Sequence, residues 1–262
     1  MPIIFSALVP HPPILIPNIG KKNIKRLKAT ANSYVKLEND LYAAQADTIL
    51  VISPHGPLQP DSFVMNLSPE YKINFEEFGD FSTKAELAGD FGLGYRIRER
   101  METRAPLQLI SQPNLDHGAA VPLYLLTQHL PKIKIIPLYY CGLDLASHYS
   151  FGQLLKRELL ISQSRIALVA SGDLSHRLTK DAPAGFNAKG KKFDNKLIEY
   201  LTKNKINQIL EMNPEFIAEA GECGLKSIVI LLGILEEIKY QPQMLSYEAP
   251  FGVGYLVMNF KL

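Results

Sequence analysis

The stretch ILVISPHGPL at residues 49–58 passes from an apolar, β-branched run into a proline, a histidine and a glycine. The chain does the same at residues 5–15, FSALVPHPPIL. A short apolar run that ends in turn residues is typical of a buried strand. The two stretches therefore predict two buried strands, each followed at once by a histidine, His11 in one case and His55 in the other.

Other runs rich in Ile, Val, Leu and Tyr predict further strands, with helical patterns between them. We expect strands at about 2–9, 47–53, 62–67, 107–111, 133–140, 165–171 and 252–260, and helices near 22–45, 83–102, 119–130, 148–161, 190–203 and 224–238. Strands that alternate with helices predict an α/β fold. Its central sheet should be mostly parallel or mixed, and helices should flank both faces.

No repeat, low-complexity tract or linker divides the sequence, so we expect a single domain over residues 1–262. Two polar segments stand out, at 68–82 and 177–190. Each is either an ordinary surface loop or a segment that borders or covers a functional site.

The composition excludes several classes of function. Of the 262 residues, 47% are hydrophobic and 21% are charged, and the formal net charge is +2 with lysine and arginine spread along the chain. Without a basic stripe we expect no nucleic acid partner. No apolar run approaches the ~20 residues of a membrane span, and the N-terminal apolar stretch lacks a basic leader, so we expect a cytoplasmic protein with no membrane contact. Cys141 and Cys223 are then expected to be reduced thiols.

Four of the six histidines follow predicted strands, and these are His11, His55, His117 and His176. Ligands of open α/β sheets bind beyond the carboxyl ends of the strands. If the strands are parallel, the four imidazoles should meet at one edge of the sheet. The other two, His129 and His148, fall in helical stretches and are expected to be packing or surface residues.

Two neutral histidines and one carboxylate can hold Fe(II) and leave positions open for substrate and dioxygen. The candidate carboxylates are Asp116, Asp173 and Glu222. Asp116 and Asp173 could equally bond turn amides or orient an imidazole. Glu222 stands before a strongly apolar helix, where it is either a ligand or a group that stabilises the helix N-terminus.

Six phrases in this order carry a family resemblance: LVPHPPIL, SPHG, LDHGAAVPL, SGDLSH, GECGLKS and EAPFGVGY. Over essentially its whole length the chain resembles the class III extradiol ring-cleaving dioxygenases of the LigB type. It is most similar to the extradiol-like domains of the AmmeMemoRadiSam system and more distantly to Memo-like proteins. The resemblance implies a mononuclear non-haem Fe(II) site, with zinc as a substitute after purification.

Matched by motif, His11 and His55 correspond to the two histidine ligands and Glu222 to the carboxylate ligand. His176 corresponds to the catalytic acid/base, and His117 to a catalytic histidine that lines the substrate pocket. The implied partners are O2 and a catechol, an aminophenol or a related small aromatic, with a homo-oligomer or a separate second subunit as further expectations.

Cys223 falls where Memo-like proteins place a metal-binding cysteine. Neighbouring helical residues point about 100° apart, so we expect only one of the pair to face the metal, and Glu222 is favoured. One other hypothesis is a Memo-like, metal-binding accessory protein of a radical-SAM-linked modification system, without ring cleavage. Another is a hydrolase that uses Ser171 or Ser175 with a histidine. The hydrolase is weaker because no G-x-S-x-G elbow is present.

Overall fold

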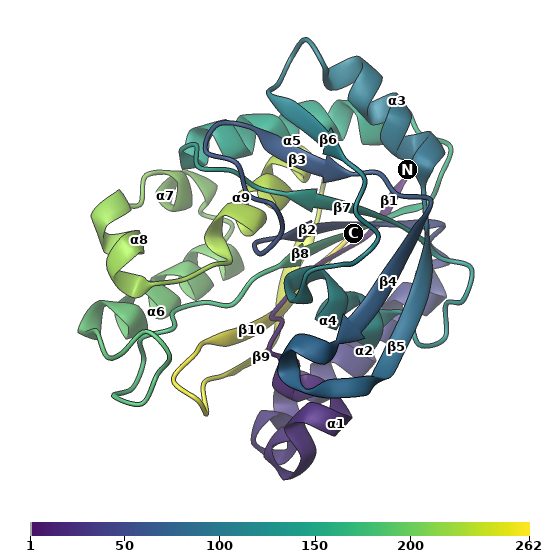
Figure 1. Ribbon diagram of the computed structural model, residues 1–262. Helices are drawn as coiled ribbons and strands as arrows, with labels where there is room; N and C mark the ends of the chain where they lie inside the picture. The colour runs from purple at the N-terminus through teal and green to yellow at the C-terminus, as the bar shows by residue number, and fades with distance from the viewer. Residues whose placement is uncertain (1) are drawn as a thin grey trace.

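The strands pair into one ten-stranded sheet, shown in a computed structural model that describes residues 2–262 (Figure 1). The order is β4-β5-β7-β2-β8-β1-β10-β9, and β3 pairs with β6 and β7. The strands are β1 (Ile3–Val9), β2 (Thr48–Ser53), β3 (Phe63–Asn66), β4 (Glu70–Phe75), β5 (Asp80–Gly89), β6 (Leu107–Ile110), β7 (Lys134–Tyr139), β8 (Ile166–Ser171), β9 (Gln241–Glu248) and β10 (Tyr255–Lys261).

Helices cover both faces of this sheet (Figure 1). They are α1 (Pro17–Gly20), α2 (Lys28–Ala44), α3 (Phe91–Met101), α4 (His117–Leu126), α5 (Leu145–Leu160), α6 (Ala188–Thr202), α7 (Ile206–Leu210), α8 (Pro214–Ala220) and α9 (Leu225–Ile234), with 3-10 turns η1 (Pro13–Leu15), η2 (Lys21–Leu27) and η3 (Glu76–Phe78). The α/β fold with a mixed sheet is the one that the sequence predicts.

Alternate residues of β2 enter two separate cores. Leu50 and Ile52 pack with α5 and α9, whereas Ile49 and Val51 pack with α2 and α4. Successive side chains of a strand point to opposite faces, so a strand covered on both faces must be apolar throughout. This is why residues 49–52, ILVI, are apolar without a break.

The central strands β5, β7, β2, β8 and β1 are parallel to one another. Their carboxyl ends therefore lie at the same edge of the sheet. The outer pairings of β10 with β1, of β9 with β10 and of β4 with β5 are antiparallel. Consequently, the loops after β1, β2 and β8 all open on one edge, where a site can assemble.

All seven predicted strands are present, but β4, β5 and β9 were not predicted, and the helix near 83–102 is wrong over its first part. The polar segment at 68–82 is not a loop: it forms β4, η3 and the start of β5. Its stretch EYKINF alternates exposed and buried residues, the pattern of a strand with one face in water.

Within residues 2–262, the helices are all too short or too polar to cross a membrane.

His148 is fully buried near the start of α5 and joins that helix to the end of β7. Its Nδ1 lies 2.6 Å from the carbonyl oxygen of Asp144, and its Nε2 accepts from the amide of Cys141 at 3.3 Å. Nδ1 must therefore carry the proton. Burial is the main cause that lowers the pKa of His148 to about 4. His129, by contrast, has a 74% exposed side chain and lies in a turn after α4.

We expect His148 to make folding sensitive to acid. Its folded pKa is below the usual 6.5, so its contribution to stability is complete above pH 6.5 and is lost as the pH falls to 4. A shift of this size corresponds to about 3 kcal/mol in the free energy of unfolding. Urea unfolding at pH 7 and at pH 4 gives the drop in the free energy of unfolding between the two. This drop should be smaller in His148→Gln than in the unchanged chain, by about the same 3 kcal/mol. An equal loss in both would contradict this assignment.

Candidate metal centre

Two glycines bring the loop after β8 against the turn that begins α9. A Cβ on Gly172 would lie 2.1 Å from the Cα of Gly224, so only glycine permits this approach. The carbonyl of Asp173 accepts hydrogen bonds from the amides of Cys223 and Gly224. The phrases SGDLSH and GECG, far apart in the sequence, are thereby joined backbone to backbone.

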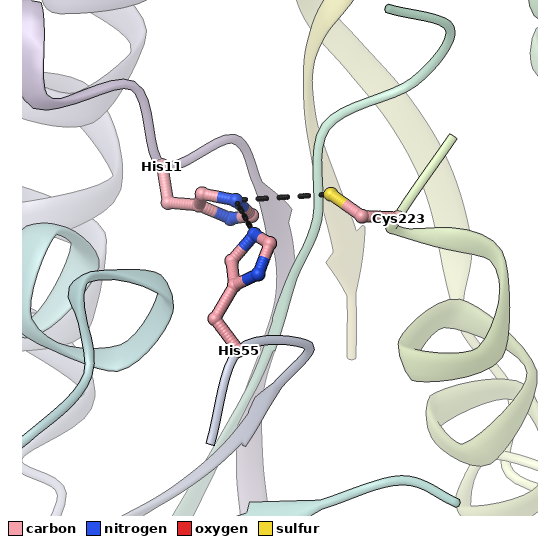
Figure 2. Close-up of side chains that lie close together, drawn as sticks. All are labelled: His11, His55 and Cys223. Atoms are coloured by element: carbon pink, nitrogen blue, oxygen red, sulfur yellow. Dashed lines mark hydrogen bonds between the residues drawn. The ribbon is translucent and has the colours of Figure 1, made fainter. Parts of the chain in front are cut away.

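Three potential metal-binding side chains meet at this junction: His11, His55 and Cys223 (Figure 2). Their ligand atoms all lie within 4.8 Å of one another. The Nε2 of His11 is 3.0 Å from the Nε2 of His55 and 3.7 Å from the Sγ of Cys223. His11 thus occupies the centre of the group, and the other two residues approach it from different loops.

The tautomer of His11 follows from its neighbours. The hydroxyl of Ser171 donates its proton to the carbonyl oxygen of Gly118 at 2.5 Å, so it can only accept from the Nδ1 of His11, which lies 2.9 Å away. The proton is therefore on Nδ1. The lone pair of Nε2 is left facing His55 and Cys223, as a metal ligand requires.

Both central imidazoles are neutral, the buried His11 and also His55, which is more exposed but is surrounded by other histidines. Burial is the main cause that lowers the pKa of His11 and that lowers the pKa of His55 to about 3, and nearby histidines add to both shifts. Burial also raises the pKa of the Cys223 thiol, with Asp173 and Glu222 adding to the shift. Neutral imidazoles are ready to bind a cation. The thiol would have to release its proton on binding one.

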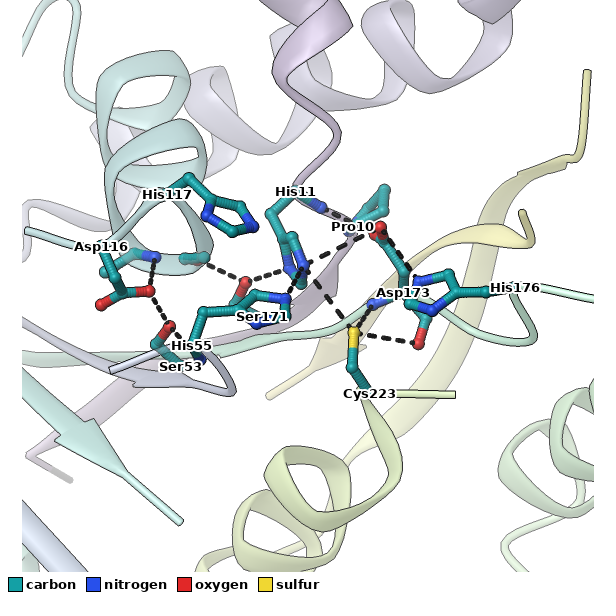
Figure 3. Close-up of polar contacts among 12 residues, drawn as sticks. Pro10, His11, Ser53, His55, Asp116, His117, Ser171, Asp173, His176 and Cys223 are labelled. Atoms are coloured by element: carbon teal, nitrogen blue, oxygen red, sulfur yellow. Dashed lines mark hydrogen bonds and ion pairs between the residues drawn. The ribbon is translucent and has the colours of Figure 1, made fainter. Parts of the chain in front are cut away.

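Asp173 lies between His11 and His176 (Figure 3). Its Oδ1 accepts from the amide of His11 at 2.9 Å, and its Oδ2 is 3.8 Å from the Nε2 of both histidines. Burial alone would raise the pKa of Asp173, but the two histidines outweigh it and the pKa is lowered. A carboxylate therefore stands between the potential metal ligands and the predicted acid/base.

His117 stacks on His55, with ring centroids 4.4 Å apart and planes at 24°. Its Nδ1 is 3.5 Å from Oε1 of Glu77, and the ring of Phe78 meets it edge to face at 5.4 Å. Both contacts come from η3, the tip of the β4–β5 hairpin. The segment at 68–82 thus borders the site, which is the second of the two interpretations given for it from the sequence.

The structure does not bring Glu222 together with His11 and His55. One carboxylate oxygen of Glu222 accepts from the amide of Leu225 at 2.5 Å, in the first turn of α9. Burial is the main cause that raises the pKa of Glu222 to about 7. The geometry thus gives Glu222 the helix-stabilising contact and places its neighbour, Cys223, beside the histidines. As a metal ligand, Glu222 remains a prediction that this arrangement does not support.

Asp116 also has a structural contact. Its Oδ1 accepts from the hydroxyl of Ser53 at 2.5 Å and from the amide of Ala119 at 3.2 Å, which caps α4. Ser175, in the same loop as His176, donates its hydroxyl to the carbonyl of Ala220 at 2.7 Å. The hydroxyl of Ser171 accepts from the Nδ1 of His11 and donates to the carbonyl of Gly118. The hydroxyls of both serines in the hydrolase hypothesis therefore already donate to backbone carbonyls beside the site.

The three donors fit a metal ion. Ligands bound at ~2.0–2.3 Å to one ion lie roughly 3–4 Å apart, and the Nε2 of His11 is 3.0 Å from the Nε2 of His55 and 3.7 Å from the Sγ of Cys223. Two imidazoles and a thiolate suit zinc and also iron. Asp173 takes the second of its two predicted roles, because it contacts the amide of His11 and lies beside both His11 and His176. The support that Ser171 gives to His11 was not predicted, because nothing in the sequence links a distant serine to that histidine.

The chain belongs to the LigB family. Residues 6–258 match the family model described as the catalytic LigB subunit of aromatic ring-opening dioxygenase. It is 33% identical over 264 residues to Protein CA_C1420 of Clostridium acetobutylicum, an alignment that covers 97% of this chain and 56% of that protein. The chain thus spans little more than half the length of that relative.

Two proteins of Escherichia coli are also similar. The chain is 26% identical over 258 residues to 3,4-dihydroxyphenylacetate 2,3-dioxygenase, an alignment that covers 92% of this chain and 93% of that protein. The crystal structure of uncharacterized protein JW3007 from E. coli K12 superposes with a TM-score of 0.68 at 16% identity, over 98% of this chain and 99% of that one. The latter likeness shows that the two share a fold.

Adjacent substitutions should separate the roles of residues 222 and 223. Cys223→Ala should lose most of its bound metal, because it removes one of three converging donors. Glu222→Gln should keep it, because an amide oxygen still accepts from Leu225, while Glu222→Ala should cost about 1 kcal/mol of stability through loss of that contact. Metal content after anaerobic loading and thermal unfolding of all three variants would test this. Metal lost from Glu222→Gln but kept by Cys223→Ala would contradict it.

Proposed function

We propose that this protein is a metal-dependent dioxygenase that opens the ring of a small aromatic diol or aminophenol. The observation that carries the proposal is the convergence of His11, His55 and Cys223 beside the Asp173–His176 pair, in a chain of the LigB family. The E. coli relative is named for a catechol, 3,4-dihydroxyphenylacetate. The proposed partners are therefore O2 and a related aromatic; association with a second copy or a separate subunit stays a prediction.

In this proposal His11, His55 and Cys223 hold the metal. Bound Fe(II) would supply electron transfer between an aromatic diol and dioxygen. Both oxygen atoms enter one product and a ring carbon–carbon bond next to a hydroxylated carbon breaks, so no external reductant is needed. The donor set is also suited to zinc, so zinc after aerobic purification would not exclude iron.

His176 is placed to move the substrate proton. Its side chain is 26% exposed, so it is open to a ligand, and Asp173 stands 3.8 Å from its Nε2. The carboxylate can pair with the imidazolium that forms when Nε2 accepts a hydroxyl proton. The same nitrogen can then return the proton as the ring opens. His117, stacked on His55, would line the space where the aromatic ring binds.

One observation favours a second function. Cys223 takes the place that a carboxylate has in the facial triad of iron oxygenases, and a thiolate with two imidazoles is a common zinc donor set. The protein would then be a metal-binding accessory factor, similar to Memo-like proteins, without ring cleavage. Metal analysis after anaerobic purification, followed by oxygen uptake on a panel of catechols, distinguishes the two. Iron with substrate-dependent uptake supports the dioxygenase; bound metal without uptake supports the accessory role.

A further inference from the structure

A cavity of about 490 Å³ opens beside His55 and is lined largely by polar residues. Three of them are carboxylates and three are primary amides: Glu76, Glu77, Asp116, Asn74, Gln112 and Asn114. Among residues 2–262, no lysine or arginine lines it. A part of a ligand that leaves His55 toward this cavity would therefore meet charged groups that are all acidic.

The three carboxylates differ in how far they are engaged. Asp116 is held through its Oδ1 by Ser53 and Ala119, and its Oδ2 is buried with no hydrogen-bond partner among residues 2–262. Glu76 accepts from the Nζ of Lys84 at 2.9 Å. Glu77 has the Nδ1 of His117 as its nearest ionisable partner, at 3.5 Å, and its side chain is 60% exposed. Of the two exposed carboxylates, that of Glu77 thus retains more capacity to meet a charged group on a ligand.

Glu77 is also tied to the candidate metal centre through ring contacts. It precedes Phe78, which meets His117 edge to face, and His117 stacks on His55. Because His55 and Glu77 line the same cavity, a ring substituent that enters this cavity from the centre would meet Glu77. A single exposed charge pair contributes little, but the fields of several like charges in one cavity add up.

We propose that the site selects aromatic diols whose ring substituent is cationic, such as a protonated amine, and discriminates against carboxylate substituents, with Glu77 as the principal specificity-determining residue. This inference rests on the proposed function, because it assumes that a diol binds at the centre. Because attraction of a cation and repulsion of an anion act together, we expect the two substituents to differ by about tenfold in affinity.

Binding to the full chain loaded with Zn(II), which cannot carry out the redox reaction, tests selectivity without turnover. The probes are 2-(3,4-dihydroxyphenyl)ethylamine, 4-methylcatechol and 3,4-dihydroxyphenylacetate, which are cationic, neutral and anionic at pH 7. Anaerobic calorimetry should give the tightest binding for the amine and the weakest for the carboxylate. The tenfold ratio should shrink severalfold in Glu77→Gln, and the order should reverse in Glu77→Lys.

Glu86→Gln is the matched control. It removes the same charge from an exposed position on β5 that does not line the cavity, so the ratio should not change. A carboxylate probe that binds as tightly as the amine overturns the inference, while binding of 4-methylcatechol leaves the proposed function standing. A preference that survives in Glu77→Lys overturns the role of Glu77. A protein that binds none of the three probes refutes the proposed function and this inference together.

Discussion

His11→Ala should lose nearly all of the bound metal. Its Nε2 lies between the other two donors, 3.0 Å from the Nε2 of His55 and 3.7 Å from the Sγ of Cys223. Without it only two donors remain, and the atom that lies near both of them is gone. Substitution of groups that merely support a ligand costs about 10–100-fold in metal affinity, so loss of a ligand should cost more than 100-fold. Metal content and the dissociation constant, measured after anaerobic loading with Fe(II) and separately with Zn(II), provide the check.

His129→Ala is the control for this experiment, since it makes the same change at a 74% exposed side chain away from the centre. It should bind metal like the unchanged chain. Circular dichroism should show that His11→Ala is still folded, because the two apolar cores do not include His11. Full metal occupancy in a folded His11→Ala protein would rule out the proposed centre.

His176→Ala should keep its metal but lose turnover by about 10²–10⁴-fold, the usual worth of a positioned acid or base. The imidazole of His176 stands beyond Asp173, outside the group formed by His11, His55 and Cys223. Its removal therefore leaves the three donors in place but takes away the group that accepts the substrate proton. Steady-state oxygen uptake on the best catechol, together with metal content, separates the two effects.

The pattern across variants decides the assignment. Equal metal loss in His176→Ala and His11→Ala would mean that His176 is itself a ligand and that the centre has three histidines. Unchanged turnover in His176→Ala with metal retained would leave the proton transfer to another group. His129→Ala again serves as the control, because it lacks any contact with the site.

Much of the architecture could be predicted because the central strands are buried on both faces. Their apolar runs, such as TILVIS in β2 and IALVAS in β8, are visible in the sequence without any tertiary information. The edge strands have no such run. β9 is largely exposed and polar, and β4 alternates over only six residues, so neighbouring strands rather than composition determine that these segments pair.

The same reasoning explains the partial prediction of the site. His11, His55 and His176 follow parallel strands, and the carboxyl ends of parallel strands meet at one edge of a sheet. The choice between Glu222 and Cys223 had no such basis. Both precede α9, and their orientation depends on the turn at Gly224 packing against Gly172.

The sequence by itself determined the α/β class, the parallel centre of the sheet and the edge at which the histidines gather, because local hydrophobic patterns encode buried strands and their ends. Only the tertiary structure decided which atoms face one another. The contact between Gly172 and Gly224 turns the thiol of Cys223 toward His11 and leaves the carboxylate of Glu222 on the amide of Leu225. Two adjacent residues have nearly the same sequence context, so only packing between distant loops can separate them.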